Sequence, residues 1–117
     1  MKDKRKSPRV TKSLPLKLSD AESDILTETK NISASGAYCT VNKPLEIMTK
    51  LNVVILVPVK KNKNKTIRKV NCSGVVVRNE YSADNGKYPY KIAIYFNDLK
   101  SQDRRTLQSY ITPFLIK

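Results

Sequence analysis

Short runs of alternating apolar and polar residues, separated by turn-forming residues, limit what this 117-residue chain can fold into. In residues 10–18, Val10, Leu14, Leu16 and Leu18 occupy positions of the same parity. Successive side chains of a strand point to opposite faces, so this run predicts a strand with one buried face. Similar reasoning predicts five further strands, at residues 25–32, 37–41, 51–59, 66–78 and 90–96.

Near the C-terminus the apolar period changes from two to that of a helix. The residues that follow helical spacing are Leu107, Tyr110, Ile111 and Phe114. Asp98 or Ser101 is suited to cap the start of this helix. Pro113 disfavours helical backbone at Thr112, so we expect the helix to end near that residue.

These elements predict a mainly β fold: a small antiparallel six-stranded barrel with a C-terminal α-helix packed over one opening. The length suits one domain, which we assign to residues 10–117. Residues 1–9 are basic and almost without apolar side chains, so we expect a flexible arm. Residues 60–65 read as a polar hairpin loop, and Gly74 as the site of a bulge or tight bend.

The composition points to an anionic partner and away from catalysis. Lys and Arg number 23 against 10 Asp and Glu, and the net charge is +13. Histidine is absent, and Cys39 and Cys72 are isolated in strand-like runs, which favours buried, inert thiols over a disulfide or zinc site. We therefore expect no enzyme, metal or cofactor. No apolar run approaches the ~20 residues of a membrane helix, and no apolar segment follows the basic N-terminus, so we expect no membrane insertion and a cytoplasmic protein.

Two polar motifs precede or interrupt the first strands. One is Arg-x-x-x-Arg at Arg5 and Arg9, and the other is Asn-x-Ser-x-x-Gly at Asn31, Ser33 and Gly36. Together, ahead of a β-rich chain, they resemble the signature of the PilZ family. The run from Gly74 to Arg78 resembles that family's Gly-x-Val-x-Arg strand, and residues 90–110 resemble its closing strand and helix. Ala93 is a departure, since many relatives have Gly there, and we expect its methyl to affect packing more than binding.

The resemblance implies a PilZ-like barrel that acts as a non-catalytic bacterial receptor for cyclic di-GMP, in the regulation of motility or biofilm formation. It assigns ligand binding to Arg5, Arg9, Asn31, Ser33 and Gly36. Ligand would order the N-terminal arm, and a downstream effector protein would sense the change. A guanidinium pairs with phosphate oxygens or with the O6 and N7 atoms of guanine. Asn31 and Ser33 share a parity and would face the same guanine edge, while Gly36 would provide positive φ or a close approach to the ligand.

Two other functions stay open. A small basic barrel can bind RNA or single-stranded DNA, but aromatic residues are only 7% and Trp is absent, which argues against a stacking groove. A PilZ-like interaction module that has lost its ligand is the second. Taken alone, residues 31–36 also suit an Asx-type turn, and Arg5 and Arg9 a solvated tail. Tyr38 and Arg78 can reach a ligand, although packing and a solvated strand end suit them better.

Overall fold

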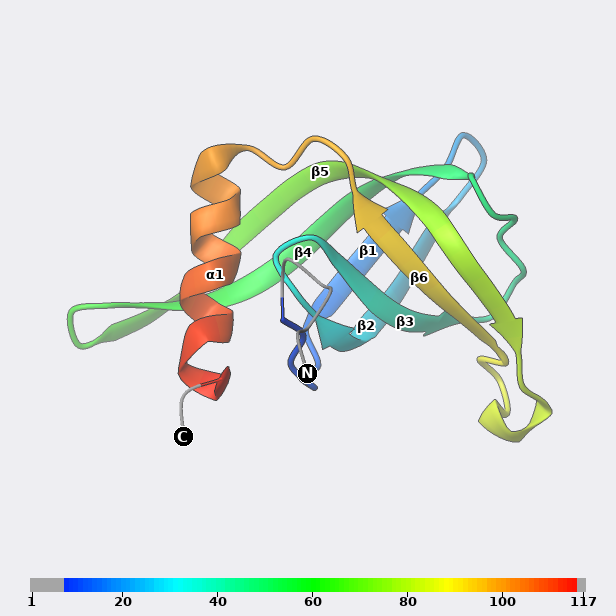
Figure 1. Cartoon of the computed structure of the whole chain (residues 1–117), viewed down its shortest axis with the longest axis horizontal. Coiled ribbons are helices and arrows are strands. Elements are labelled where there is room, and N and C mark those ends of the chain that lie inside the picture. The colour runs from blue at the N-terminus through cyan, green and yellow to red at the C-terminus, as the bar shows by residue number, and fades with distance from the viewer. Residues whose placement is uncertain (1–7, 116–117) are drawn as a thin grey trace, which may run out of the picture.

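Six antiparallel strands close into a barrel in the computed structural model, which describes residues 8–115 (Figure 1). The order around the barrel is β1-β2-β3-β6-β5-β4. The strands are β1 (Pro15–Ser19), β2 (Asp24–Ile32), β3 (Gly36–Val41), β4 (Lys50–Lys61), β5 (Asn64–Tyr81) and β6 (Tyr90–Phe96). A short 3-10 helix, η1 (Ala83–Asn85), precedes β6, and α1 (Ser101–Leu115) ends the fold. The predicted fold class is confirmed.

The alternation in the sequence decides which side chains fill the barrel. Val53, Ile55 and Val57 of β4 are fully buried, as are Val70 and Val76 of β5. Burying each such side chain is worth about 1.5–3 kcal/mol. Strand parity therefore separates a continuous aliphatic core from an outward face, and the candidate site lies on that outward face.

The first predicted strand is only partly regular. Val10 forms an isolated bridge with Ile32, and the ladder of β1 begins at Pro15. Between them the Leu14 amide donates to the Thr29 hydroxyl at 2.9 Å, and that hydroxyl donates to the Lys12 carbonyl at 2.5 Å. The buried Thr29 side chain thus replaces the missing ladder contacts, which sequence parity does not reveal.

The β4–β5 hairpin is longer than predicted. Its strands continue through most of the expected loop to a tight turn at Asn62 and Lys63, where Asn62 has φ of 59°. Asn tolerates this left-handed conformation well. Gly74 marks no bulge, because the register shift in β5 falls between Val76 and Arg78. A Cβ on Gly74 would lie 2.7 Å from a methyl carbon of Ile94 and 2.8 Å from one of Val53, so glycine permits close packing there.

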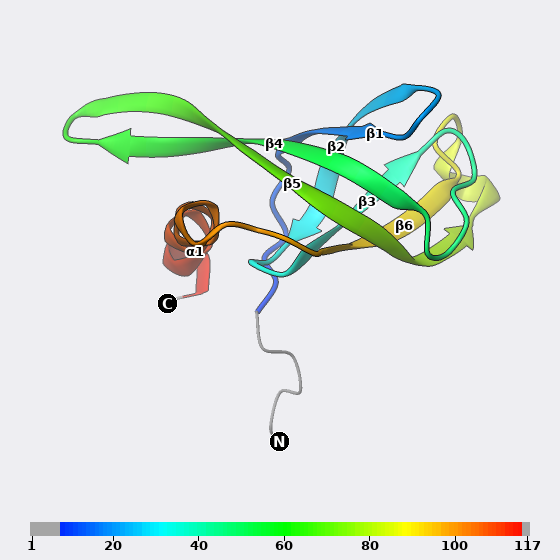
Figure 2. The ribbon, with the colours of Figure 1, turned by 90° about the horizontal axis from the view of Figure 1, so that it is seen from above.

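The helix packs against β4 and β5 at the end of the barrel where these strands run on as a ribbon (Figures 1 and 2). Leu107 and Ile111 join the barrel core. The Asp98 carboxylate accepts hydrogen bonds from the amide and hydroxyl of Ser73, at 2.6 and 3.2 Å. The Asp98 carboxylate is therefore bound to β5, and the prediction that Asp98 caps the helix is wrong.

The helix also extends beyond the predicted end, because Pro113 lies inside it. Tyr110 and Phe114 form an edge-to-face pair at 5.3 Å, and Lys12 lies over the Phe114 ring at 4.1 Å. The Thr112 hydroxyl donates to a carbonyl one turn earlier. These contacts offset the hydrogen bond that proline removes from the last turn.

Candidate functional site

The N-terminal segment meets the barrel at the end of β2. Val10 and Ile32 exchange two backbone hydrogen bonds of 2.9 Å. Both side chains are buried. The pair of hydrogen bonds holds the preceding residue, Arg9, alongside the end of β2. The exposed Arg9 is the last residue of the expected arm, and the structure fixes its backbone against the barrel.

An outward-facing row crosses four strands beside Arg9. Asn31 lies opposite Tyr38, Tyr38 opposite Ala93, and Ala93 opposite Arg78. A register shift between Thr29 and Asn31 sets one end of the row, and the shift that places Arg78 opposite Ala93 sets the other. Bulges re-aim side chains in this way, and they bring the four residues into one row across the outward side of the barrel, in which Ala93 is buried.

Tyr38 connects both arginines of this surface. The Arg9 guanidinium lies 5.1 Å from the centre of the Tyr38 ring, within the range of a cation–π contact. Arg78 Nη1 donates a 2.9 Å hydrogen bond to the Tyr38 hydroxyl. Arg78 passes over Ala93, whose small side chain leaves room for that contact. Two positive groups are therefore held around one aromatic ring.

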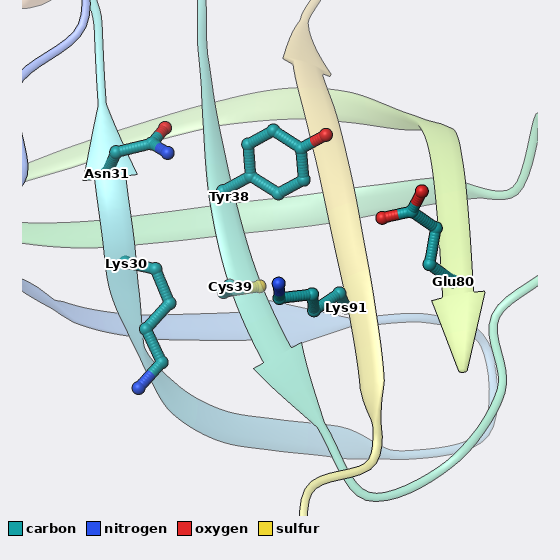
Figure 3. Close-up of a pocket in the computed structure, with 6 residues that line it drawn as sticks. All are labelled: Lys30, Asn31, Tyr38, Cys39, Glu80 and Lys91. Carbon is teal, nitrogen blue, oxygen red and sulfur yellow. The ribbon is translucent and has the colours of Figure 1, made fainter. Parts of the chain in front are cut away.

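A hollow of about 260 Å³ opens beside the ring (Figure 3). Its lining residues come from β2, β3, β5 and β6 and are Lys30, Asn31, Tyr38, Cys39, Glu80 and Lys91. Asn31 Oδ1 is buried and has no hydrogen-bond partner among the described residues. A buried acceptor without a partner is costly, so a donor from a ligand would be favoured at this position.

Ser33 and Gly36 do not have the local geometry that the sequence predicted. Ser33 is 2% exposed, and its hydroxyl accepts from the amides of Ser35 at 3.1 Å and Gly36 at 3.2 Å. Ser33 therefore stabilises the β2–β3 turn and does not share the outward face of Asn31. This correction arises because strand parity ends at Ile32, where the turn begins.

Gly36 has no positive φ and serves close packing between strands. A Cβ at this position would lie 2.4 Å from the Ile94 carbonyl oxygen of β6. The glycine requirement of the motif thus comes, in this structure, from the approach of two backbones. The proposed positive φ is wrong; the structure shows a close approach to β6, and an approach to the ligand stays a prediction.

The structure brings together only part of the predicted set. Arg9 and Asn31 flank the Tyr38 surface, Ser33 and Gly36 build the turn behind it, and Arg5 lies outside the described residues. Whether these residues contact a ligand stays a prediction.

The sequence favours packing for Tyr38 and a solvated strand end for Arg78, and it does not single out Lys30 or Lys91; the structure joins Tyr38 and Arg78 by a hydrogen bond. Parity offered a signal, since Tyr38 alternates with the apolar residues of β3. The pairing of Tyr38 with Arg78 depends on the β5 bulge and was not visible in the sequence.

The cysteines contribute no reactive group. Burial raises the pKa of Cys39 to about 12. Burial does the same for Cys72, helped by the negative charges of Asp98 and Asp103, and its pKa also rises to about 12. Thiolate is the reactive form, so both thiols are inert in the folded protein. Within residues 8–115, no cluster of three potential metal-ligating side chains occurs.

The comparisons with known proteins identify the family. The model of the PilZ domain matches residues 3–112, and the chain belongs to this family. PilZ domains are generally non-catalytic binding domains. Among curated proteins, none matches the sequence. No helix in the described part of the chain is long and apolar enough to cross a membrane.

Several solved structures share the fold. The Bacillus subtilis inhibitor of motility, MotI/DgrA, superposes with a TM-score of 0.81 at 21% identity, over 98% of this chain and 53% of that chain. This chain therefore spans about half the length of that protein. The PilZ domain of YcgR from Escherichia coli, solved with cyclic di-GMP, superposes with a TM-score of 0.64 at 10% identity, over 95% of this chain and 91% of that chain. The PilZ domain of CeSA from a cellulose-synthesizing bacterium superposes with a TM-score of 0.58 at 14% identity, over 92% of this chain and 99% of that chain.

Proposed function

We propose that this protein is a receptor for cyclic di-GMP, which it binds on the outward surface around Tyr38. The observation that carries the proposal is the convergence of Arg9, Arg78 and Asn31 on that surface, directly beside the Asn-x-Ser-x-x-Gly turn. Membership of the PilZ family and the likeness to the Escherichia coli domain solved with cyclic di-GMP support it.

The chemistry of the surface suits the two parts of the ligand. Arg5 and Arg9 provide guanidinium groups that pair with phosphate oxygens or with the Hoogsteen edge of guanine. Asn31 Oδ1 is a buried acceptor, and guanine N1–H and N2–H₂ are donors. Tyr38 offers a ring on which a base or a guanidinium stacks. An Asn amide accepts through one atom, whereas an Asp carboxylate accepts through two, so we expect weaker binding than an Asp would give.

The signal would come from the N-terminal arm. Ligand held by Arg5 and Arg9 would order residues 1–9 against the barrel, and a downstream effector protein would recognise the changed surface. Arg9 already lies over Tyr38, which would limit the change to the residues before it. The likeness to an inhibitor of motility makes a role in motility control the process that we favour.

Titration calorimetry tests the binding proposal. We expect micromolar or tighter affinity for cyclic di-GMP and much weaker binding of GTP. Arg5→Ala and Arg9→Ala should each weaken binding by at least about tenfold, because each removes a charge-assisted contact of about 1.5–3 kcal/mol. Lys63→Ala, at the tip of the β4–β5 hairpin, is the matched control and should change the affinity little. Absence of heat at millimolar ligand would instead favour an interaction module without ligand.

Amide hydrogen exchange tests the arm. Residues before Arg9 should gain protection with cyclic di-GMP, while barrel amides change little. Equal protection with and without bound ligand would contradict the switch but leave the binding proposal standing.

A further inference from the structure

One continuous stretch of the chain carries positive charge only. Residues 47–79 contain no Asp or Glu, and they contain eight basic residues: Lys50, Lys60, Lys61, Lys63, Lys65, Arg68, Lys69 and Arg78. This stretch forms β4 and most of β5. Beyond Ile55, β4 pairs only with β5, so the two strands leave the barrel as a two-stranded ribbon (Figure 2).

The outward side of this ribbon combines lysines with exposed aliphatic side chains. The cross-strand pairs are Leu56 with Lys69, Pro58 with Ile67, and Lys60 with Lys65. We name these six residues the ribbon face. Ile67 is 61% exposed and Leu56 36% exposed. The opposite side of the ribbon is not exposed in this way, because its Val57 side chain is fully buried and belongs to the barrel core.

The ribbon face continues into a shallow hollow at the barrel. This hollow has a volume of about 360 Å³, and Leu56 and Lys69 line it together with Lys17 and Val54. Lys17 of β1 lies opposite Val54 of β4, so the two lysines stand at separate sides of an apolar floor. The acidic residues nearest in register lie on β2, where Asp24 and Glu28 form the border of this surface.

The composition of the face selects its occupant. A second copy of the chain would bring lysines against lysines, which is unfavourable. Protein–protein interfaces are enriched in aromatic residues and depleted in Lys, the reverse of this face. Sites for single-stranded nucleic acid use stacking aromatics, and residues 39–80 contain none. Exposed aliphatic side chains flanked by lysines match the requirements of an anionic lipid surface, where lysine binds headgroups and the aliphatic groups enter the interface.

We propose that the ribbon face docks the protein on the surface of an anionic bilayer. Lys60, Lys65 and Lys69 contact lipid phosphates, and Ile67 and Leu56 enter the headgroup–acyl boundary. The hollow between Lys17 and Lys69 accepts one phosphate headgroup. The contact is peripheral and involves no spanning element.

This surface is separate from the one proposed for cyclic di-GMP. The Tyr38 row uses β2, β3, β6 and the end of β5, whereas the ribbon face uses β4 and the start of β5. Both can be occupied at once, and the lipid proposal stands or falls independently of the nucleotide.

Vesicle co-sedimentation of the full chain tests the proposal. The probes are vesicles of phosphatidylcholine alone and vesicles that also contain about one third phosphatidylglycerol. The protein should bind the anionic vesicles and not the neutral ones. Replacing Lys60, Lys65 and Lys69 together by Gln should weaken binding by about fivefold per lysine, or about a hundredfold in all. Ile67→Ser should weaken it roughly tenfold.

Two controls match these variants. Lys87→Gln removes an exposed lysine from the β5–β6 loop, and Met48→Ser removes a side chain that is 69% exposed before β4. Both should leave lipid binding unchanged, and thermal unfolding should be the same for all variants. Equal binding of the anionic and neutral vesicles, or no binding, would overturn the proposal. Binding that needs the lysines but not Ile67 would also overturn it, because that pattern describes a site for any polyanion. Release of the protein from the vesicles by duplex DNA would overturn it for the same reason.

Discussion

Gly36→Ala is the substitution that best separates a packing role from a ligand-binding role in the Asn-x-Ser-x-x-Gly motif. An alanine Cβ would lie 2.4 Å from the Ile94 carbonyl oxygen and 3.6 Å from the Tyr95 Cα atom. The nearer atom belongs to the backbone of β6, and Gly36 pairs with Tyr95 in the same ladder. Neither strand can move without loss of hydrogen bonds, so the extra methyl strains the barrel.

Overpacking of this kind costs about 1–3 kcal/mol. For a domain of this size, 1 kcal/mol corresponds to roughly 5 °C in the melting temperature. We therefore expect Gly36→Ala to lower the melting temperature by about 5–15 °C in a calorimetric or circular dichroism scan. Affinity for cyclic di-GMP, measured well below that temperature, should change much less than in Arg9→Ala.

Gly86→Ala is the matched control. A Cβ at Gly86 would meet no atom within 4 Å, and its φ of 62° is the only source of strain. We expect a cost of about 1–3 kcal/mol there, which comes from the local backbone conformation and not from contact with another strand. If Gly36→Ala melts like the wild type but loses the ligand, the packing explanation is refuted and Gly36 contacts the ligand.

Three further predictions concern other parts of the molecule. Tyr38→Phe keeps the ring under Arg9 but removes the acceptor for Arg78. We expect its affinity for cyclic di-GMP, measured by titration calorimetry, to fall by a few fold, and the affinity of Tyr38→Ala to fall further. Because burial raises the pKa of Cys39 and Cys72 to about 12, iodoacetamide should label neither thiol in the folded protein, and mass spectrometry should find both labelled after denaturation in urea. Hydrogen bonds from the amides of the β1–β2 turn lower the pKa of Asp20 from its ordinary value of 3.8. The ionised carboxylate therefore stabilises the fold above pH 3.8, and this stabilisation is lost as the pH falls through the lowered pKa. Asp20→Ala should therefore lower the melting temperature at neutral pH, and the difference should shrink in acid; a constant difference would contradict this.

The sequence predicted the architecture because burial follows strand parity. The predicted strands and the helix all occur, and residues 90–96 match β6 at both ends. The errors fall where tertiary contacts override a local rule. Pro113 stays helical because Lys12 and Tyr110 pack on Phe114, and Asp98 binds Ser73 of β5 in place of the helix start.

The candidate site was harder to predict than the fold. The motifs located the correct end of β2, but parity could not show that Ser33 turns inward to bond the amides of its own turn. The link between Tyr38 and Arg78 depends on the register shift in β5, and a bulge leaves no reliable mark in a single sequence. Ala93, expected to matter mainly for packing, lies between these residues on the candidate surface.

Chemical-shift mapping of ¹⁵N-labelled protein during titration with cyclic di-GMP tests the central claim most directly. The proposal predicts that the amides of Arg9, Asn31, Tyr38, Ala93 and Arg78 shift together with a single binding curve. The chemical shifts of the amides in the β4–β5 ribbon should not change. Shifts centred on the ribbon, or no shifts at millimolar ligand, would contradict the proposal that the Tyr38 surface is the receptor site.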